Sequence, residues 1–284
     1  MQQPVFKPTV PPTKFLISYG AKIRYADSGK GKVVVLLHGF LESLEMWFGN
    51  DFAEKLSKKF RVIAIDLPGH GKSDVMGYVQ KMERMADVVK DVMDQLRLRK
   101  YVMIGHSMGG YVTMAFAEKY SSSLNGFCLF HSTARGDSDE KKADRDRAIK
   151  IVKRDPIKYT NQLVINLFAV ANQKYMKKEI NFMRRIASRT KKQSIAACLE
   201  GMKIRKNREN ILRETKLSVL LIAGTRDVVV PLKALEEQSQ LLKNGELFVL
   251  ERTGHLGFLE SKELSLKKIQ QFCNACYRKR IRRS

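Results

Sequence analysis

The sequence lacks several features that would assign it to a specialised class of protein. It has no run of about 18 uncharged apolar residues, so no membrane-spanning helix is predicted. Its first residues contain no apolar segment typical of a secretory signal, and none is expected. Cysteine is scarce and unevenly placed, at Cys128, Cys198, Cys273 and Cys276. This usage favours a reducing compartment, so we expect a cytoplasmic protein.

Cys273 and Cys276 have the spacing of a redox pair or of half a metal site. No second cysteine pair accompanies them in the sequence, and they fall in a predicted C-terminal helix. We therefore expect neither a redox role nor a bound metal at this pair.

Acidic residues are also scarce. The chain has 29 acidic and 53 basic residues, a formal net charge of +24. The basic excess is divided evenly between residues 133–215 and the rest of the chain, and the one dense run, 278–283, is expected to be an exposed tail. Because aromatic residues are not interleaved with the basic ones, nucleic acid is not expected as a partner. Peripheral contact with an anionic surface is compatible with this charge.

Short apolar runs recur along the chain, with helical patterns between them. Such continuous apolar runs are expected for strands that helices bury on both faces, and charged residues and glycine bound the run at 33–37. An opening hairpin is predicted over 14–19 and 22–25. Six further strands are predicted at 33–37, 61–65, 101–104, 127–130, 218–222 and 246–250. The pattern indicates an α/β fold with a doubly wound, mostly parallel sheet of eight strands.

The alternation of strands and helices stops between about residues 133 and 216, where only helical patterns occur. This interval follows the sixth predicted strand. We therefore predict a core formed by 1–132 and 217–284, with a helical cap at 133–216 inserted after the sixth strand. The alternative is an ordinary helical subdomain whose apolar faces only pack against the core.

Residues 105–109 read Gly-His-Ser-Met-Gly, between a predicted strand and a predicted helix. A serine at such a sharp turn is held in a strained conformation, with its hydroxyl exposed above the sheet and a helix N-terminus beneath it. Gly105 and Gly109 leave room where the strand and the helix cross. The pentapeptide alone is only moderately specific, because it also arises by chance in loops.

A serine nucleophile needs a base, and the base needs an orienting carboxylate. Asp227 and His255 follow the last two predicted strands, so both fall at the sheet edge where Ser107 is expected. One alternative is that Asp227 forms a surface ion pair with Arg226. Another is that His255 is a loop histidine bonded to the backbone. Asp94 is a weaker candidate for the acid, because it lies in a predicted helix.

The chain resembles the α/β-hydrolase fold superfamily, in its serine hydrolase form with a helical cap, from about residue 15 to residue 277. Four features in the same order carry this resemblance: His38-Gly39-Phe40, the 105–109 motif, Asp227 and Gly254-His255. The segment Asp66–Ser73 also resembles the turn that follows the family's fourth strand.

The resemblance implies a role for each of these residues. Ser107 would be the nucleophile, His255 the general base and then acid, and Asp227 the group that orients the imidazole. The backbone N–H groups of Phe40 and Met108 would form the oxyanion hole. No metal or organic cofactor is implied.

Further side chains near these motifs are candidates for a substrate pocket. They are His38, Phe40, Met108, His131, Arg135, Leu163 and Phe168. His38 could instead brace the oxyanion loop, and His131, Ser132 and Arg135 could form a hydrogen-bond network at a strand end. Leu163 and Phe168 could equally belong to the core of the cap.

Together these residues predict a serine esterase that cleaves small hydrophobic carboxylic esters through an acyl-enzyme. The serine excludes the haloalkane dehalogenase and epoxide hydrolase branches of the family, whose nucleophile is an aspartate. A C–C bond hydrolase, an enol-lactonase or an acyltransferase could use the same triad. A peptidase that binds a substrate ammonium is disfavoured by the basic cap. A non-catalytic protein that binds through its basic surface is the alternative from another class.

Overall fold

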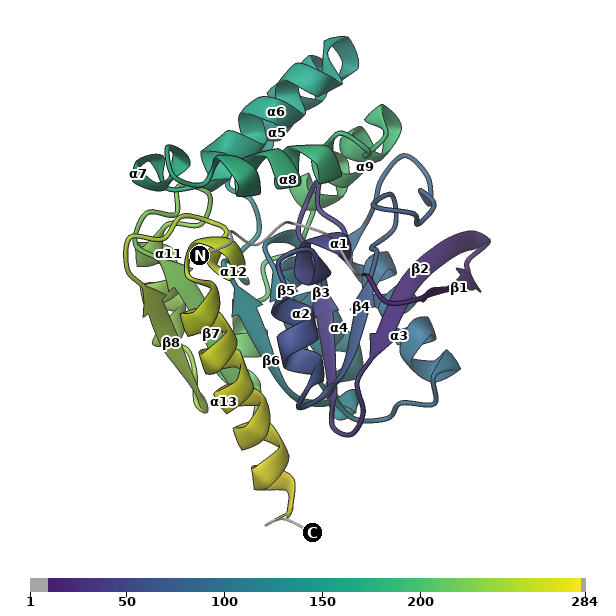
Figure 1. The fold of residues 1–284 in the computed structure, drawn as a ribbon, viewed down its shortest axis with the longest axis vertical. Helices are drawn as coiled ribbons and strands as arrows, with labels where there is room; N and C mark the ends of the chain where they lie inside the picture. The colour runs from purple at the N-terminus through teal and green to yellow at the C-terminus, as the bar shows by residue number, and fades with distance from the viewer. Residues whose placement is uncertain (1–9, 282–284) are drawn as a thin grey trace, which may run out of the picture.

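An eight-stranded sheet forms the centre of the fold in the computed structural model, which describes residues 10–281 (Figure 1). The strands are β1 (Thr13–Ser18), β2 (Ala21–Ser28), β3 (Val33–Leu37), β4 (Arg61–Ile65), β5 (Tyr101–His106), β6 (Leu124–Phe130), β7 (Ser218–Gly224) and β8 (Gly245–Leu250). Their order is β1-β2-β4-β3-β5-β6-β7-β8. Strand β2 runs antiparallel to both its neighbours, β1 and β4, and strands β3 to β8 pair in parallel. The structure confirms the expected α/β fold and its mostly parallel sheet.

Helices cover both faces of this sheet (Figure 1). They are α1 (Glu45–Phe48), α2 (Phe52–Ser57), α3 (Met82–Gln95), α4 (Met108–Tyr120), α11 (Leu232–Ser239), α12 (Gly257–Glu260) and α13 (Lys262–Ile281). Helix α2 packs beside α13, and α3 packs beside α4. Every residue of β3 and β5 is buried, which explains why these strands appear in the sequence as continuous apolar runs.

Six further helices lie in sequence between β6 and β7, and Figure 1 shows those labelled α5 to α9 above the sheet. They are α5 (Asp139–Arg154), α6 (Pro156–Leu167), α7 (Val170–Gln173), α8 (Lys177–Ala187), α9 (Lys192–Lys203) and α10 (Glu209–Glu214). Asp155 caps the N-terminus of α6 by accepting a hydrogen bond from the Lys158 N–H at 2.9 Å, and Pro156 starts the helix. The division into core and cap at residues 133 and 216 stays a prediction.

At Gly201, helix α9 lies at backbone contact with the segment before α3. A Cβ atom on Gly201 would lie 1.8 Å from the Gln80 carbonyl oxygen, a separation that no real contact allows. The Gln80 N–H donates to the Ala197 carbonyl at 2.9 Å, one turn earlier in the same helix. Only glycine at 201 therefore lets α9 lie this close to the segment before α3.

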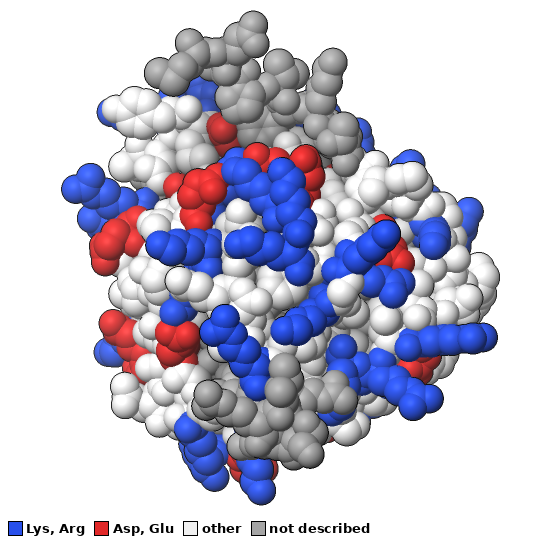
Figure 2. All heavy atoms as spheres, turned by 60° about the horizontal axis from the view of Figure 1, so that its bottom comes forward, with Lys and Arg blue, Asp and Glu red and all other residues white. Residues whose placement is uncertain are grey.

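The charge excess is spread over the surface. In the face shown in Figure 2, basic side chains lie across the whole surface with acidic ones between them. The expected basic tail is partly helical, because α13 continues to Ile281, and residues 282–284 lie outside the described residues. The four cysteines are buried and unlinked. Among residues 10–281, no helix is both long and apolar enough to cross a membrane.

Replacing Gly201 with alanine should destabilise the protein, because the new methyl group must push α9 away from Gln80. We expect the free energy of unfolding to fall by about 1–3 kcal/mol in urea titrations, the usual cost of overpacking. Gln193→Ala, on the exposed face of the same helix, is the control and should change it by less than about 0.5 kcal/mol. Equal stability of the two variants would contradict the close contact.

Candidate catalytic site

Ser107 occupies the turn between β5 and α4 in a strained conformation, with φ 50° and ψ −117°. A Cβ atom on Gly105 would lie 2.4 Å from the Gly109 carbonyl oxygen, and one on Gly109 would lie 2.5 Å from that of Leu37. The strand and the helix therefore cross at backbone contact, as the two glycines predicted. The Ser107 N–H donates to the Phe130 carbonyl at 3.0 Å, which ties the turn to the end of β6.

Asp227 and His255 form a hydrogen-bonded pair at the same edge of the sheet. The His255 Nδ1 lies 2.8 Å from the Asp227 Oδ2, and both side chains are buried. The other carboxylate oxygen accepts the N–H groups of Val229 at 2.8 Å and Val230 at 3.0 Å. Burial alone would raise the pKa of Asp227, but the adjacent His255 and His131 hold it well below its usual range. Asp227 is therefore an ionised carboxylate in a fixed orientation.

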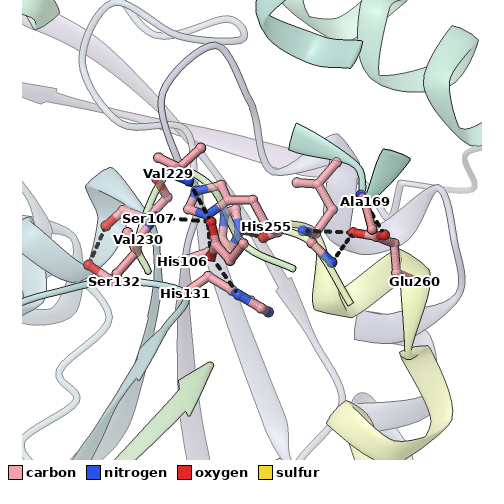
Figure 3. A network of polar contacts seen from close by, with 12 residues as sticks. His106, Ser107, His131, Ser132, Ala169, Val229, Val230, His255 and Glu260 are labelled. Carbon is pink, nitrogen blue, oxygen red and sulfur yellow. Dashed lines mark hydrogen bonds and ion pairs between the residues drawn. The ribbon is translucent and has the colours of Figure 1, made fainter. Parts of the chain in front are cut away.

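The second ring nitrogen of His255 is available for chemistry. Because Nδ1 faces a carboxylate, it carries the hydrogen, and Nε2 has the lone pair. Among the described residues, this buried Nε2 has no hydrogen-bond partner. Figure 3 shows Ser107 and His255 in the same group of side chains. The serine and the histidine therefore both lie in turns at the carboxyl ends of the strands, Ser107 after β5 and His255 after β8.

Two alternatives from the sequence are wrong. Asp227 is only 6% exposed and pairs with histidines, whereas Arg226 is exposed, so the two do not form a surface ion pair. The other candidate acid, Asp94, lies on α3, where it pairs with Lys90. That the three residues after β5, β7 and β8 act together as a catalytic triad stays a prediction.

The loop after β3 lies against the serine. A Cβ atom on Gly39 would lie 3.0 Å from the Ser107 Cβ. Within residues 10–281, the backbone N–H groups of Phe40 and Met108 donate no hydrogen bond to another protein group. That these two donors form an oxyanion hole stays a prediction.

Glu42 also lies at this site, although no motif in the sequence indicated it. Its Oε2 accepts the Gly39 N–H at 2.5 Å and lies 2.9 Å from the Nδ1 of His106. The His106 Nε2 lies 2.9 Å from the backbone carbonyl oxygen of His255. Both ring nitrogens of His106 thus face oxygen atoms, an arrangement that the doubly protonated imidazolium satisfies beside an ionised Glu42. The pair links the oxyanion loop to the histidine loop.

The ionisation of His106 agrees with this geometry. Burial alone would lower the pKa of His106, but the Glu42 carboxylate and the hydrogen bonds to Glu42 and His255 outweigh it and raise the pKa above the ordinary value of 6.5. His38 is a different case, because its Nδ1 lies 2.7 Å from the Gly39 carbonyl and its Nε2 accepts the Leu67 N–H at 2.9 Å. Burial lowers the pKa of His38 well below its usual range, so it braces the loop as a neutral ring.

The structure places His131 and Ser132 in the network at the end of β6. His131 is fully buried, with its Nδ1 3.0 Å from the Asp227 Oδ2. The Ser132 hydroxyl donates to the Ser107 carbonyl oxygen at 2.7 Å. These contacts match the hydrogen-bond network that the sequence left as an alternative, and a substrate contact of His131 stays a prediction.

The other candidates for the pocket also make contacts within the protein. Arg135 is ion-paired with Glu209 at 2.6 Å and with Glu237 at 2.7 Å. Leu163 is half-buried and Phe168 is buried, both packed in the hydrophobic core. Their contact with a substrate stays a prediction, as does that of the side chains of Phe40 and Met108.

Glu260 joins the segment between α6 and α7 to the histidine loop (Figure 3), and the sequence pattern did not indicate it. Its carboxylate accepts the N–H of Ala169 and that of Gly254, each at 3.0 Å. The His255 N–H itself donates to the Leu167 carbonyl at 2.7 Å. The helices between β6 and β7 therefore contact the histidine directly through the backbone.

One grouping among the described residues could hold a metal ion. It consists of His131, Asp227 and His255, whose ligand atoms lie within 4.8 Å of one another. The same atoms make the hydrogen bonds of the Asp227 carboxylate, and a metal ion would have to displace both Nδ1 hydrogens.

Comparisons with known proteins agree with this architecture. A family model described as the alpha/beta hydrolase fold matches residues 32–262. The pimeloyl-[acyl-carrier protein] methyl ester esterase of Nitrosomonas europaea is 26% identical over 251 residues, which cover 86% of this chain and 96% of that protein. A putative 2-succinyl-6-hydroxy-2,4-cyclohexadiene-1-carboxylate synthase of Bacillus subtilis is 27% identical over 268 residues, or 90% of this chain and 96% of that one.

A solved structure is similar over nearly the whole chain. It is a thermophilic esterase from Thermogutta terrifontis, with a TM-score of 0.87, 29% sequence identity and coverage of 94% of this chain and 99% of that one. The names of these proteins differ in the reaction they describe, so their common property is the fold.

The raised pKa of His106 predicts a pH-dependent stability. A histidine whose pKa is higher in the folded state stabilises the fold fully below its unfolded pKa of 6.5, and this contribution is lost as the pH rises through the folded value. Glu42→Gln removes the charge that raises the pKa. In urea titrations near pH 6 we expect this variant to be less stable by about 2–4 kcal/mol, with the difference from wild type shrinking as the pH rises through the folded pKa of His106.

Glu263→Gln is the matched control, because Glu263 pairs with Lys55 at the exposed surface. It should change the free energy of unfolding by less than about 1 kcal/mol at every pH. A constant difference between Glu42→Gln and wild type across this pH range would contradict the charged state of the Glu42–His106 pair.

Proposed function

Because the chain belongs to the alpha/beta hydrolase fold family, we propose that it is a serine hydrolase that cleaves carboxylic esters of small hydrophobic substrates through an acyl-enzyme. The observation that carries this proposal is the buried Asp227–His255 pair, whose free Nε2 lies at the same sheet edge as the strained Ser107 turn. A relative and a structural neighbour named as esterases support it.

In the first half of the reaction, His255 Nε2 takes the Ser107 hydroxyl proton as the oxygen attacks the ester carbonyl carbon. The carbonyl oxygen becomes an oxyanion, which the N–H groups of Phe40 and Met108 bind. Each such donor contributes about 3 kcal/mol of transition-state stabilisation in comparable sites. The oxyanion then collapses, the C–O bond to the alcohol breaks, and His255 gives its proton to the departing oxygen.

Water completes the cycle. His255 takes a proton from water, the hydroxide attacks the acyl-enzyme, and the carboxylic acid leaves as the proton returns to Ser107. Asp227 stabilises the imidazolium that forms in both halves, which agrees with its depressed pKa. These steps need no metal or organic cofactor.

The helices between β6 and β7 would act as the cap that closes the substrate site. The bond from the His255 N–H to Leu167 and the Glu260 contacts place the α6–α7 segment beside the base. The side chains of Phe40, Met108, Leu163 and Phe168 would form apolar walls there, with His38, His131 and Arg135 at their margin. The four buried, unlinked cysteines are consistent with a cytoplasmic location.

Replacing the Ser107 hydroxyl tests the proposal. Wild type should hydrolyse short p-nitrophenyl esters and be labelled covalently by a fluorophosphonate. Ser107→Ala should lose labelling completely and lower kcat by at least about 10⁴-fold, because the nucleophile is gone. Ser188→Ala, on an exposed serine after α8, is the control and should keep both properties.

The same preparation distinguishes the alternatives that share the triad. Lactones, acyl acceptors and C–C substrates assayed at the same pH would show turnover above that of the esters if one of those reactions is the true one. Fluorophosphonate labelling that survives in Ser107→Ala would overturn the assignment of the nucleophile.

A further inference from the structure

We propose that His131 is a positioning residue of this site, a second imidazole that fixes the Asp227 carboxylate on which His255 depends. The proposal rests on the serine hydrolase function proposed above and adds a residue to it. In a plain Ser-His-Asp triad, one histidine donates to the carboxylate. Here two histidines from different loops donate to the same oxygen atom.

One carboxylate oxygen is shared by the two rings. The Asp227 Oδ2 lies 3.0 Å from the His131 Nδ1 and 2.8 Å from the His255 Nδ1. The two rings have centroids 5.7 Å apart and meet at 63°, so they approach the oxygen from different directions. Val229 and Val230 hold the other oxygen. Four donors therefore leave this carboxylate no freedom to rotate.

The surroundings are shaped to hold the His131 ring. His131 has φ 49°, a left-handed conformation that costs a non-glycine residue about 1–3 kcal/mol. A Cβ atom on Gly257 would lie 2.4 Å from the His131 Nε2, and one on Gly224 would lie 3.0 Å from its Cε1. The ring stacks on Phe130, with centroids 5.1 Å apart. Two glycines and a strained backbone thus make room for an imidazole at this position.

The protonation state makes His131 a neutral donor. Burial lowers the pKa of His131 to about 4, against the opposing effect of the hydrogen bond to Asp227. The ionisable groups that face it are Asp227, His255 and His106, and the last two also lower its pKa. Near neutral pH the single ring hydrogen of His131 lies on Nδ1, because that nitrogen faces the carboxylate.

A neutral second donor has two consequences for the base. It holds the carboxylate still, so the His255 ring stays aimed at the serine. It also takes part of the hydrogen-bonding capacity of Oδ2, so the His255 imidazolium is stabilised less and passes its proton to the leaving group more readily. Removing the donor should therefore lower kcat and move the acidic limb of the pH profile of kcat/KM to higher pH.

Two substitutions distinguish the effect of the His131 N–H donor from the effect of side-chain packing. His131→Leu fills the space without an N–H group, whereas His131→Asn places an amide N–H near the position of Nδ1. We expect His131→Leu to lower kcat for a p-nitrophenyl ester about tenfold with KM unchanged, and to raise the acidic limb by about half a pH unit. His131→Asn should recover most of the lost kcat and most of the shift in the acidic limb.

Phe130→Leu is the packing control, because it removes the ring that stacks on His131 and touches no carboxylate. It should lower the melting temperature and leave the acidic limb where it is. An unchanged limb in His131→Leu, or a His131→Asn variant as impaired as His131→Leu, would overturn the role of His131. Failure of wild type to turn over esters or to be labelled would instead remove the proposed function.

Proton NMR tests the shared oxygen without any turnover. We expect two low-field Nδ1–H signals from histidines bonded to Asp227 in wild type and in Ser107→Ala, and one in His131→Leu. The same number of these signals in wild type and in His131→Leu would overturn the proposal.

Discussion

The crossing of β5 and α4 is the constraint on which the site depends. The two segments meet with no space for a side chain at Gly105, and Gly109 lies just as close to the end of β3. The turn between β5 and α4 holds Ser107 at φ 50°. Such a conformation costs about 1–3 kcal/mol and persists only where the surroundings hold it. Here the Ser107 N–H bonds to Phe130 and the Ser132 hydroxyl bonds to the Ser107 carbonyl. The end of β6 therefore secures the strained turn, and the N-terminus of α4 comes to lie beneath the serine.

Buried charges connect the loops that surround this turn. An isolated carboxylate in the interior costs several kcal/mol, so each one needs donors, and in this protein the donors come from different loops. Asp227 receives them from the loops after β6, β7 and β8, and Glu42 from the loop after β3 and from the end of β5. Asp66 accepts the Leu44 N–H and pairs with Arg24 of β2. Satisfying the charges and fixing the relative positions of the loops are thus the same physical requirement.

The strands, the opening hairpin and the glycine-bounded serine turn could be predicted from the sequence, because each depends on neighbouring residues. The contacts that complete the site could not, because they join distant segments. Glu42 meets His106 across 64 positions, His131 meets Asp227 across 96, and Ala169 meets Glu260 across 91. Nothing in the local pattern distinguishes Glu42 or Glu260 from a surface acid. For His131 the sequence left a pocket and a network equally open, and only the path of the loop after β7 places Asp227 beside it.

The path of the α6–α7 segment bears on the size of the substrate. The His255 N–H bonds to the Leu167 carbonyl, and Glu260 holds both Ala169 and Gly254, so the segment and the base form one unit. A molecule large enough to lift this segment would break the His255–Leu167 bond and leave the Glu260 carboxylate with fewer donors. The cost of those lost hydrogen bonds falls on His255, the residue that we propose accepts the serine proton. Under the proposed function this segment closes the substrate site, and its ties to His255 favour small substrates, the class of ester proposed above.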